Sequence, residues 1–186
     1  VSLHGFTGEV ADFDAIREAL PSDTRFSAPD LPGHGSRRHQ RDLRDYSIET
    51  HLALITEAAT SPQVTLLGYS MGGRLALHWA LANPERVARL ILIGASPGLA
   101  TPAEREERRL GDATLADFIR TRGLEAFFKY WHNQTFFQPL LKLPAERLRP
   151  IMESRHGNDP EGLALSLDNI GTGTCLLYTS DAADDL

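Results

Sequence analysis

The first hundred residues alternate short apolar runs with stretches whose apolar positions recur every three or four residues. The apolar runs predict β-strands at 1–3, 24–28, 63–67 and 87–93. The helical spacing predicts helices at about 12–20, 47–59 and 70–82, the first two capped by Asp12 and Ser47. Strands that alternate with helices in this way predict a mostly parallel sheet of the α/β class, with helices covering both of its faces.

A different pattern begins near residue 100, where strand-like alternation stops. Helical spacing predicts successive helices at 102–110, 112–121, 123–132, 144–156 and 160–169. We therefore expect residues 1–99 to form an incomplete α/β core and residues 100–165 to form a helical cap. Residues 166–174 would return toward the core.

Composition narrows the function classes. The 186 residues carry a formal net charge of −6, which argues against a nucleic-acid binder. The single cysteine, Cys175, excludes an intrachain disulfide framework and a cysteine-rich metal site, and it fits a reducing cytoplasm. The sequence has neither a signal peptide nor a run of about 20 apolar residues, so no membrane association is expected.

Residues 68–72 read Gly-Tyr-Ser-Met-Gly, a G-x-S-x-G pentad between a predicted strand and a predicted helix. A sharp turn between these elements would expose the Ser70 hydroxyl as a nucleophile or base, with the glycines supplying backbone freedom. The alternative is an ordinary glycine-rich turn, but the position between strand and helix favours the catalytic interpretation.

A serine in such a site needs donors for a developing oxyanion. The N–H of Met71 is one candidate, and the loop at His4-Gly5-Phe6 offers the N–H of Phe6 as the second. The alternative for this loop is a plain turn. His34 lies in a Pro- and Gly-rich loop, where we expect it to hold the loop through hydrogen bonds rather than to transfer protons.

Several arginines suit a substrate with carboxylates. Arg74 follows Ser70 by four residues, and the predicted cap contains Arg105, Arg108, Arg109 and Arg155. Arginine binds carboxylates with charge-assisted hydrogen bonds, but surface salt bridges are the alternative for each of them. Trp131 is by default a core aromatic of the cap.

Several motifs together resemble the α/β-hydrolase fold: His-Gly-Phe-Thr-Gly at 4–8, Asp-Leu-Pro-Gly-His-Gly at 30–35 and the pentad. The extension Gly-Arg-Leu-Ala-Leu at 73–77, the Glu-Arg-x-x-Arg-Arg segment at 104–109 and Phe128-x-x-Trp131 are similar to the MenH family. Its members are 2-succinyl-6-hydroxy-2,4-cyclohexadiene-1-carboxylate synthases of menaquinone (vitamin K2) biosynthesis.

The resemblance implies a lyase that abstracts a ring proton and eliminates pyruvate from a small polycarboxylate substrate, with no metal or organic cofactor. It makes Ser70 the catalytic serine, with the oxyanion hole formed by Phe6 and Met71. The substrate-binding residues it implies are Tyr69, Arg74, Arg108, Trp131 and Arg155.

The sequence departs from the family pattern in two ways. The family's triad acid and histidine follow its cap, and this sequence offers neither of them there. In addition, residues 175–186 match nothing in the family, so we expect this stretch to be a non-native tail. We therefore expect a fragment, truncated at both ends and inactive by itself. A serine carboxylesterase or C–C hydrolase of the same fold is the alternative enzyme, a non-enzymatic chain is the third hypothesis, and the oligomeric state stays open.

Overall fold

The computed structural model describes residues 1–174, which contain a parallel sheet of three strands. The strands are β1 (Ser2–Leu3), β2 (Val64–Tyr69) and β3 (Val87–Ile93), in that spatial order. Leu3 pairs with Gly68 across the first ladder, and Tyr69 pairs with Ile93 across the second. The strand predicted at 87–93 is confirmed with its bounds, and β2 extends two residues beyond the predicted end.

One face of the sheet is covered by helices. Alternate residues of β2 are buried against α3 (Met71–Ala82), and α2 (Ile48–Ala58) packs on the outer side of α3. Their apolar side chains form the core of the α/β layer, which includes Ile55, Leu66, Leu75 and Trp79. The predicted parallel sheet with flanking helices is confirmed, and the side chains at 91–93 of its edge strand β3 are exposed.

Two expectations for the first fifty residues are corrected. The segment predicted as a strand at 24–28 contains no strand, and its backbone contact to β1 is the bond from the Ser2 N–H to the Ser27 carbonyl (2.9 Å). Asp12 is not the N-cap residue of a helix. It is the third residue of the 3-10 helix η1 (Val10–Phe13), whose N-cap is Glu9 and which leads into α1 (Asp14–Ala19).

Short 3-10 helices complete this half of the chain: η2 (Gly35–Arg37), η3 (Leu43–Tyr46) and η4 (Pro84–Arg86). Ser47 caps α2 as predicted, and its hydroxyl accepts a hydrogen bond from the Thr50 N–H. The cap satisfies one of the amide groups that a helix N-terminus leaves without an internal partner.

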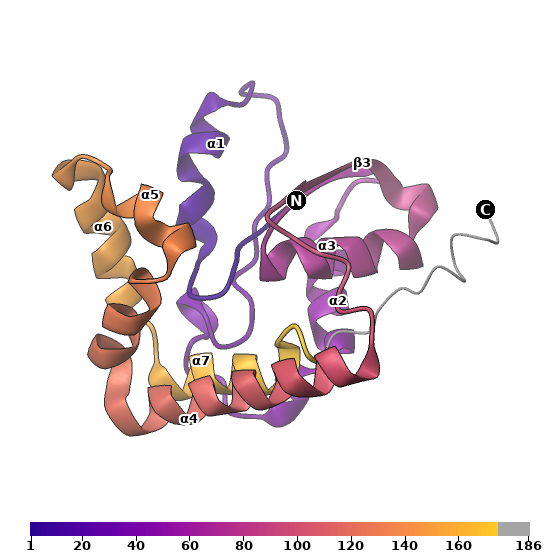
Figure 1. Cartoon of the computed structure of the whole chain (residues 1–186). Coiled ribbons are helices and arrows are strands. Elements are labelled where there is room, and N and C mark those ends of the chain that lie inside the picture. Colours follow the sequence, from indigo (N-terminus) through magenta and orange to yellow (C-terminus); the bar gives the residue numbers. More distant parts are fainter. Residues whose placement is uncertain (175–186) are drawn as a thin grey trace.

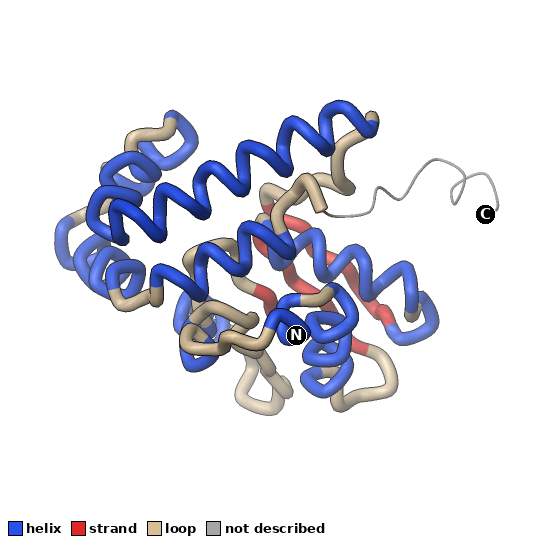
Figure 2. The backbone as a smooth tube through the Cα atoms, turned by 90° about the horizontal axis from the view of Figure 1, so that it is seen from below, coloured by secondary structure: helices blue, strands red, loops and turns tan. Residues whose placement is uncertain are grey.

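Residues 102–170 are helical. The elements are α4 (Pro102–His132), η5 (Thr135–Phe137), α5 (Gln138–Leu141), α6 (Ala145–His156) and α7 (Pro160–Ile170). The three helices predicted between 102 and 132 form one long helix, α4, interrupted by non-helical backbone at Gly123. α7 runs alongside α4 beneath the α/β layer (Figure 1 and Figure 2). The domain boundary expected after residue 165 therefore falls inside α7.

The helical region has its own hydrophobic cluster between α4 and α7, built around Ile119, Phe127 and Leu163. The Phe6 side chain packs against this cluster and also against the core of the α/β layer. Its ring meets that of Trp131 edge-on, with 5.8 Å between the centroids. Phe6 thus joins the two halves of the structure. Within residues 1–174, no helix is long and apolar enough to cross a membrane.

Candidate active site

Ser70 occupies the turn between β2 and α3 in a backbone conformation that L-residues rarely adopt. Its φ and ψ angles are 52° and −114°. The turn is held by a hydrogen bond from the Ser70 N–H to the Ile93 carbonyl (2.9 Å), and the Ser70 carbonyl accepts from the Arg74 N–H (3.1 Å). Left-handed backbone at a non-glycine residue costs about 1–3 kcal/mol and is typical of functional sites. The strain is concentrated on the serine that the pentad singled out.

A cavity of about 1110 Å³ opens beside this turn, between the α/β layer and the helical region. It is lined by all eight residues that the sequence nominated, drawn from both halves of the chain. These are Phe6, Tyr69, Ser70, Met71, Arg74, Arg108, Trp131 and Arg155. Residues separated by up to 149 positions thus contribute to one site, which the sequence pattern by itself did not establish.

The two expected oxyanion donors lie at the start of a helix and in a loop that side-chain hydrogen bonds hold. Met71 is the first residue of α3, so its N–H has no acceptor inside the helix. The loop that carries Phe6 is held by His4, which is buried and whose Nε2 accepts from the Leu31 N–H (3.0 Å). Burial lowers the pKa of His4, and with Nδ1 directed to the Gly5 carbonyl (2.9 Å) the neutral ring fits both contacts.

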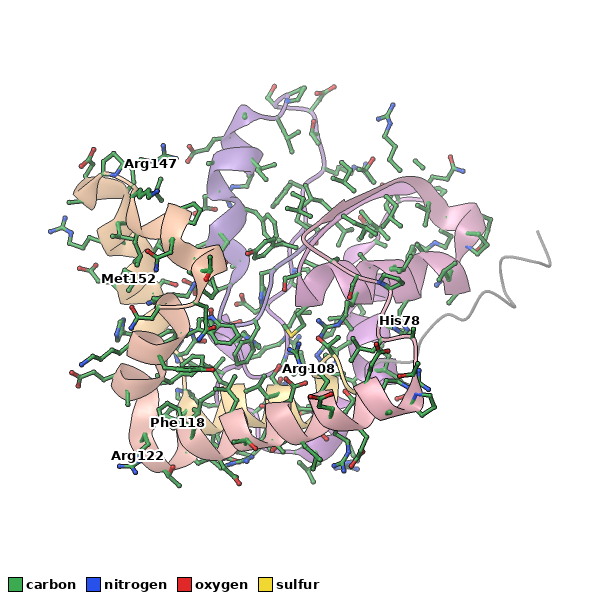
Figure 3. All side chains as sticks on the ribbon, in the orientation of Figure 1. His78, Arg108, Phe118, Arg122, Arg147 and Met152 are labelled. Atoms are coloured by element: carbon green, nitrogen blue, oxygen red, sulfur yellow. The ribbon has the colours of Figure 1, made fainter. Side chains whose placement is uncertain are left out.

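Each of the three arginines is held by a protein acceptor. Arg74 donates from Nη2 to the Ile170 carbonyl (2.8 Å), and Arg108 donates from Nε to Asp112 Oδ1 (2.8 Å). Arg155 donates from Nη2 to both carboxylate oxygens of Asp12 (2.8 Å each). In Figure 3 the Arg108 side chain rises from α4 toward the α/β layer, whereas Arg122 and Arg147 lie on the outside of the molecule.

Aromatic side chains form the apolar part of the wall. Trp131 packs against Phe127, with 5.4 Å between the ring centroids, as expected of a core aromatic residue. It also lines the cavity. The Tyr69 ring is 46% exposed and lies over Gly5, where a Cβ atom would come within 2.8 Å of it. The glycine therefore gives the ring the space it occupies.

His34 makes the hydrogen bond expected of it within its own loop. Its Nδ1 lies 3.0 Å from the Pro32 carbonyl, the residue is fully buried, and it does not line the cavity. In the described part of the chain, the Ser70 hydroxyl forms no hydrogen bond with a histidine or a carboxylate. Two carboxylates later in the chain are held by other contacts: Asp159 caps α7, and Asp168 pairs with Arg120 (2.9 Å).

Two histidines lie in the helical region at 102–170. His132 is buried at the end of α4 and stacks on Phe128, with 5.4 Å between the ring centroids, while His156 is exposed at the end of α6. Over residues 1–174, no group of three or more His, Cys, Asp or Glu side chains is arranged to hold a metal ion. The expectation of a non-native tail at 175–186 lies outside the described residues.

Sequence reasoning missed two carboxylates next to the arginines, Asp12 and Asp112. Asp112 is buried and follows Arg108 by one helical turn, so the i,i+4 spacing was a usable signal. Asp12 precedes Arg155 by 143 residues, and no local pattern links them.

The chain belongs to the α/β-hydrolase fold family, because the profile described as "alpha/beta hydrolase fold" matches residues 1–145. More specifically, it is 42% identical over 177 residues to the "Putative 2-succinyl-6-hydroxy-2,4-cyclohexadiene-1-carboxylate synthase" of Bacillus subtilis, covering 94% of this chain and 64% of that protein. The synthase of Citrobacter koseri is 32% identical over 171 residues, which are 90% of this chain and 65% of that protein.

A solved structure, "Structure of MenH from S. aureus", superposes with a TM-score of 0.84 at 32% identity, covering 95% of this chain and 67% of that one. The resemblance to the MenH family is thereby confirmed. The chain spans 64% and 65% of the lengths of the two curated relatives.

Proposed function

We propose that this chain carries the serine-centred part of a lyase active site, which eliminates pyruvate from 2-succinyl-5-enolpyruvyl-6-hydroxy-3-cyclohexene-1-carboxylate in menaquinone biosynthesis. The observation that carries the proposal is that Ser70, Arg74, Arg108 and Arg155 line the same cavity. The names of the curated relatives favour the same reaction.

In this proposal the turn at Ser70 is a nucleophile elbow. The Ser70 oxygen removes a proton from the substrate ring, and its own proton passes to a triad histidine outside residues 1–174. The electrons of the broken C–H bond at C2 pass through an enolate-type intermediate into a C2=C3 double bond, the ring's C3=C4 double bond moves to C4=C5, and the C–O bond at C5 breaks. The leaving group departs as enolpyruvate, which takes up a proton at its methylene carbon and becomes pyruvate.

The N–H groups of Phe6 and Met71 are proposed as the oxyanion hole. An enolate-type intermediate develops negative charge on oxygen, and fixed backbone donors stabilise such charge without reorganisation during the reaction. Met71 supports this assignment because it is the first residue of α3, where the helix dipole adds to the effect of its N–H.

The arginines are proposed to bind the substrate's carboxylates, and Tyr69 and Trp131 to bound its ring. Arg74 follows the elbow by one helical turn, and Arg108 and Arg155 approach from α4 and α6. A neutral ester offers these cations no partner, which favours the lyase over the carboxylesterase alternative. In the same proposal the enzyme is cytoplasmic, with a core at 1–99, a cap at 100–165 and a return segment at 166–174.

Pyruvate release by the full-length gene product tests the proposal. Continuous detection with lactate dehydrogenase and NADH should show turnover that Ser70→Ala reduces by about 10³-fold or more. Robust hydrolysis of a neutral ester without pyruvate release would reject it. Arg74→Lys separates the two enzymes further, since a change in KM is expected for the polycarboxylate but not for a neutral ester.

A further inference from the structure

Hydrogen bonds and an ion pair connect the end of α6 to residues 7–12, which directly follow Phe6. The Ser154 hydroxyl donates to the Glu9 carboxylate, Arg155 pairs with Asp12, and the Asn158 side-chain amide donates to the Thr7 carbonyl (3.1 Å). Three contacts thus join the end of α6 and the residues directly after it to residues 7–12. This segment directly follows Phe6, whose N–H is one of the two proposed oxyanion donors.

The Asp12 carboxylate also makes a hydrogen bond within this segment, in addition to its contact with Arg155. One of its oxygens accepts a hydrogen bond from the Glu9 N–H (3.2 Å), which closes the capping box of η1. The same oxygen lies over Gly8, where a Cβ atom would come within 2.6 Å of it. Position 8 therefore needs a glycine if the carboxylate is to occupy this place.

Arg155 has hydrogen-bonding capacity that the described residues do not use. Its Nη2 is committed to Asp12, its side chain is 16% exposed, and it lines the cavity. The Nη1 atom is buried and has no hydrogen-bond partner within residues 1–174. A buried donor without an acceptor is unfavourable, so an anionic ligand in the cavity gains by supplying one.

The geometry points to Asp12 as a positioning residue for anion recognition: it orients the Arg155 guanidinium in the cavity wall and ties it to the loop that carries Phe6. This inference deepens the proposed function and rests on its premise that the cavity binds a polycarboxylate. Asp12 also lines the cavity, and its carboxylate contacts Arg155. Because its proposed effect passes through the arginine, its removal should weaken anion binding only where Arg155 is present.

Calorimetric titration of the full-length protein with propane-1,2,3-tricarboxylate tests this. Asp12→Asn keeps the shape of the side chain and removes its charge, and we expect the affinity to fall by about tenfold. Ser154→Ala is the matched control, because it removes the neighbouring contact of the same interface without changing a charge. It should leave the affinity within about twofold of wild type.

A double-mutant cycle distinguishes positioning from a general structural role. In an Arg155→Met background, Asp12→Asn should produce no further loss of tricarboxylate affinity, because its effect passes through the arginine. An equal loss in both backgrounds would overturn the inference. So would an unchanged affinity of the Asp12→Asn protein, or the absence of tricarboxylate binding by the wild type.

Turnover measurements separate this inference from the proposed function. With the lyase substrate, Asp12→Asn should raise KM by about tenfold and leave kcat within about threefold of wild type. If the wild type binds tricarboxylate in an Asp12-dependent way but releases no pyruvate, the reaction is wrong and the positioning role stands. If pyruvate is released and Asp12→Asn changes neither KM nor affinity, only the positioning role fails.

Discussion

The backbone of Leu3 lies directly against Gly72. A Cβ atom at position 72 would come within 2.2 Å of the Leu3 carbonyl oxygen, a distance that real Cβ atoms essentially never show. The second glycine of the pentad thus lets the start of α3 approach the end of β1. This close approach places the turn at Ser70 beside the loop that carries Phe6.

Gly72→Ala should therefore disrupt the site and the fold together. The added methyl group meets backbone, which has no flexible end that can move aside, so we expect a loss of about 3 kcal/mol or more in the free energy of unfolding. Urea denaturation measures the loss. Gly111→Ala, where a Cβ meets nothing within 4 Å, is the control, and equal stability of the two variants would contradict the close approach.

The positive φ of Ser70 predicts a difference between two substitutions that both remove its hydroxyl. Glycine adopts a φ of 52° without strain and alanine does not, so Ser70→Gly should be more stable than Ser70→Ala by about 1 kcal/mol. Thermal and urea denaturation of both variants provide the comparison. If Ser70→Ala proves the more stable of the two, the turn is not strained in solution.

Local patterns predicted the elements that local interactions determine. The strand at 87–93 was predicted with its bounds because a compact apolar run follows a Pro-containing turn, and Ser47 was recognised as a cap from its position before a helical pattern. The prediction of a strand at 24–28 is wrong, because within residues 1–174 this segment pairs with β1 through a single backbone bond, at the Ser27 carbonyl. Apolar spacing reports extension, not pairing.

The candidate site was predictable where motifs carry it and not where distant residues meet. The motifs predicted the roles of Ser70, Met71 and Phe6, and the structure shows in addition that the three residues line one cavity. Asp12 was interpreted as a helix cap, since a short polar side chain before a helical pattern has that role most often. Its partner Arg155 comes from a different half of the chain, so only tertiary packing reveals the pair.

Two glycines of α4 predict opposite effects of the same substitution. A Cβ atom meets nothing within 4 Å at either Gly111 or Gly123, but Gly111 is helical whereas Gly123 has a φ of 74°. Gly111→Ala should stabilise the protein by about 0.5–1 kcal/mol, and Gly123→Ala should destabilise it by about 1 kcal/mol. Chemical denaturation of the two variants reports both signs. Stabilisation by both would mean that α4 continues through residue 123 without a break.

Buried histidines predict how stability depends on pH. His4, His34 and His51 are buried, and burial lowers the pKa of each below 6.5, so the native state holds them neutral while the unfolded state protonates near 6.5. The unfolded state therefore binds more protons, and stability should be fully present above pH 6.5 and fall as the pH decreases below it. Each histidine contributes up to about 1.4 kcal/mol per pH unit in that window.

Urea denaturation between pH 8 and pH 5 measures this slope, and His34→Gln should make it shallower by about one proton. Asp30 does not contribute to the slope between pH 8 and pH 5. Burial acts to raise its pKa, but hydrogen bonds from the Ser36 and Val10 N–H groups and the Ser36 hydroxyl outweigh it and lower the pKa below 3.8, so its contribution is lost only at still lower pH. A stability that is flat from pH 8 to pH 5 would mean that these histidines are hydrated or already paired with acids in the native protein.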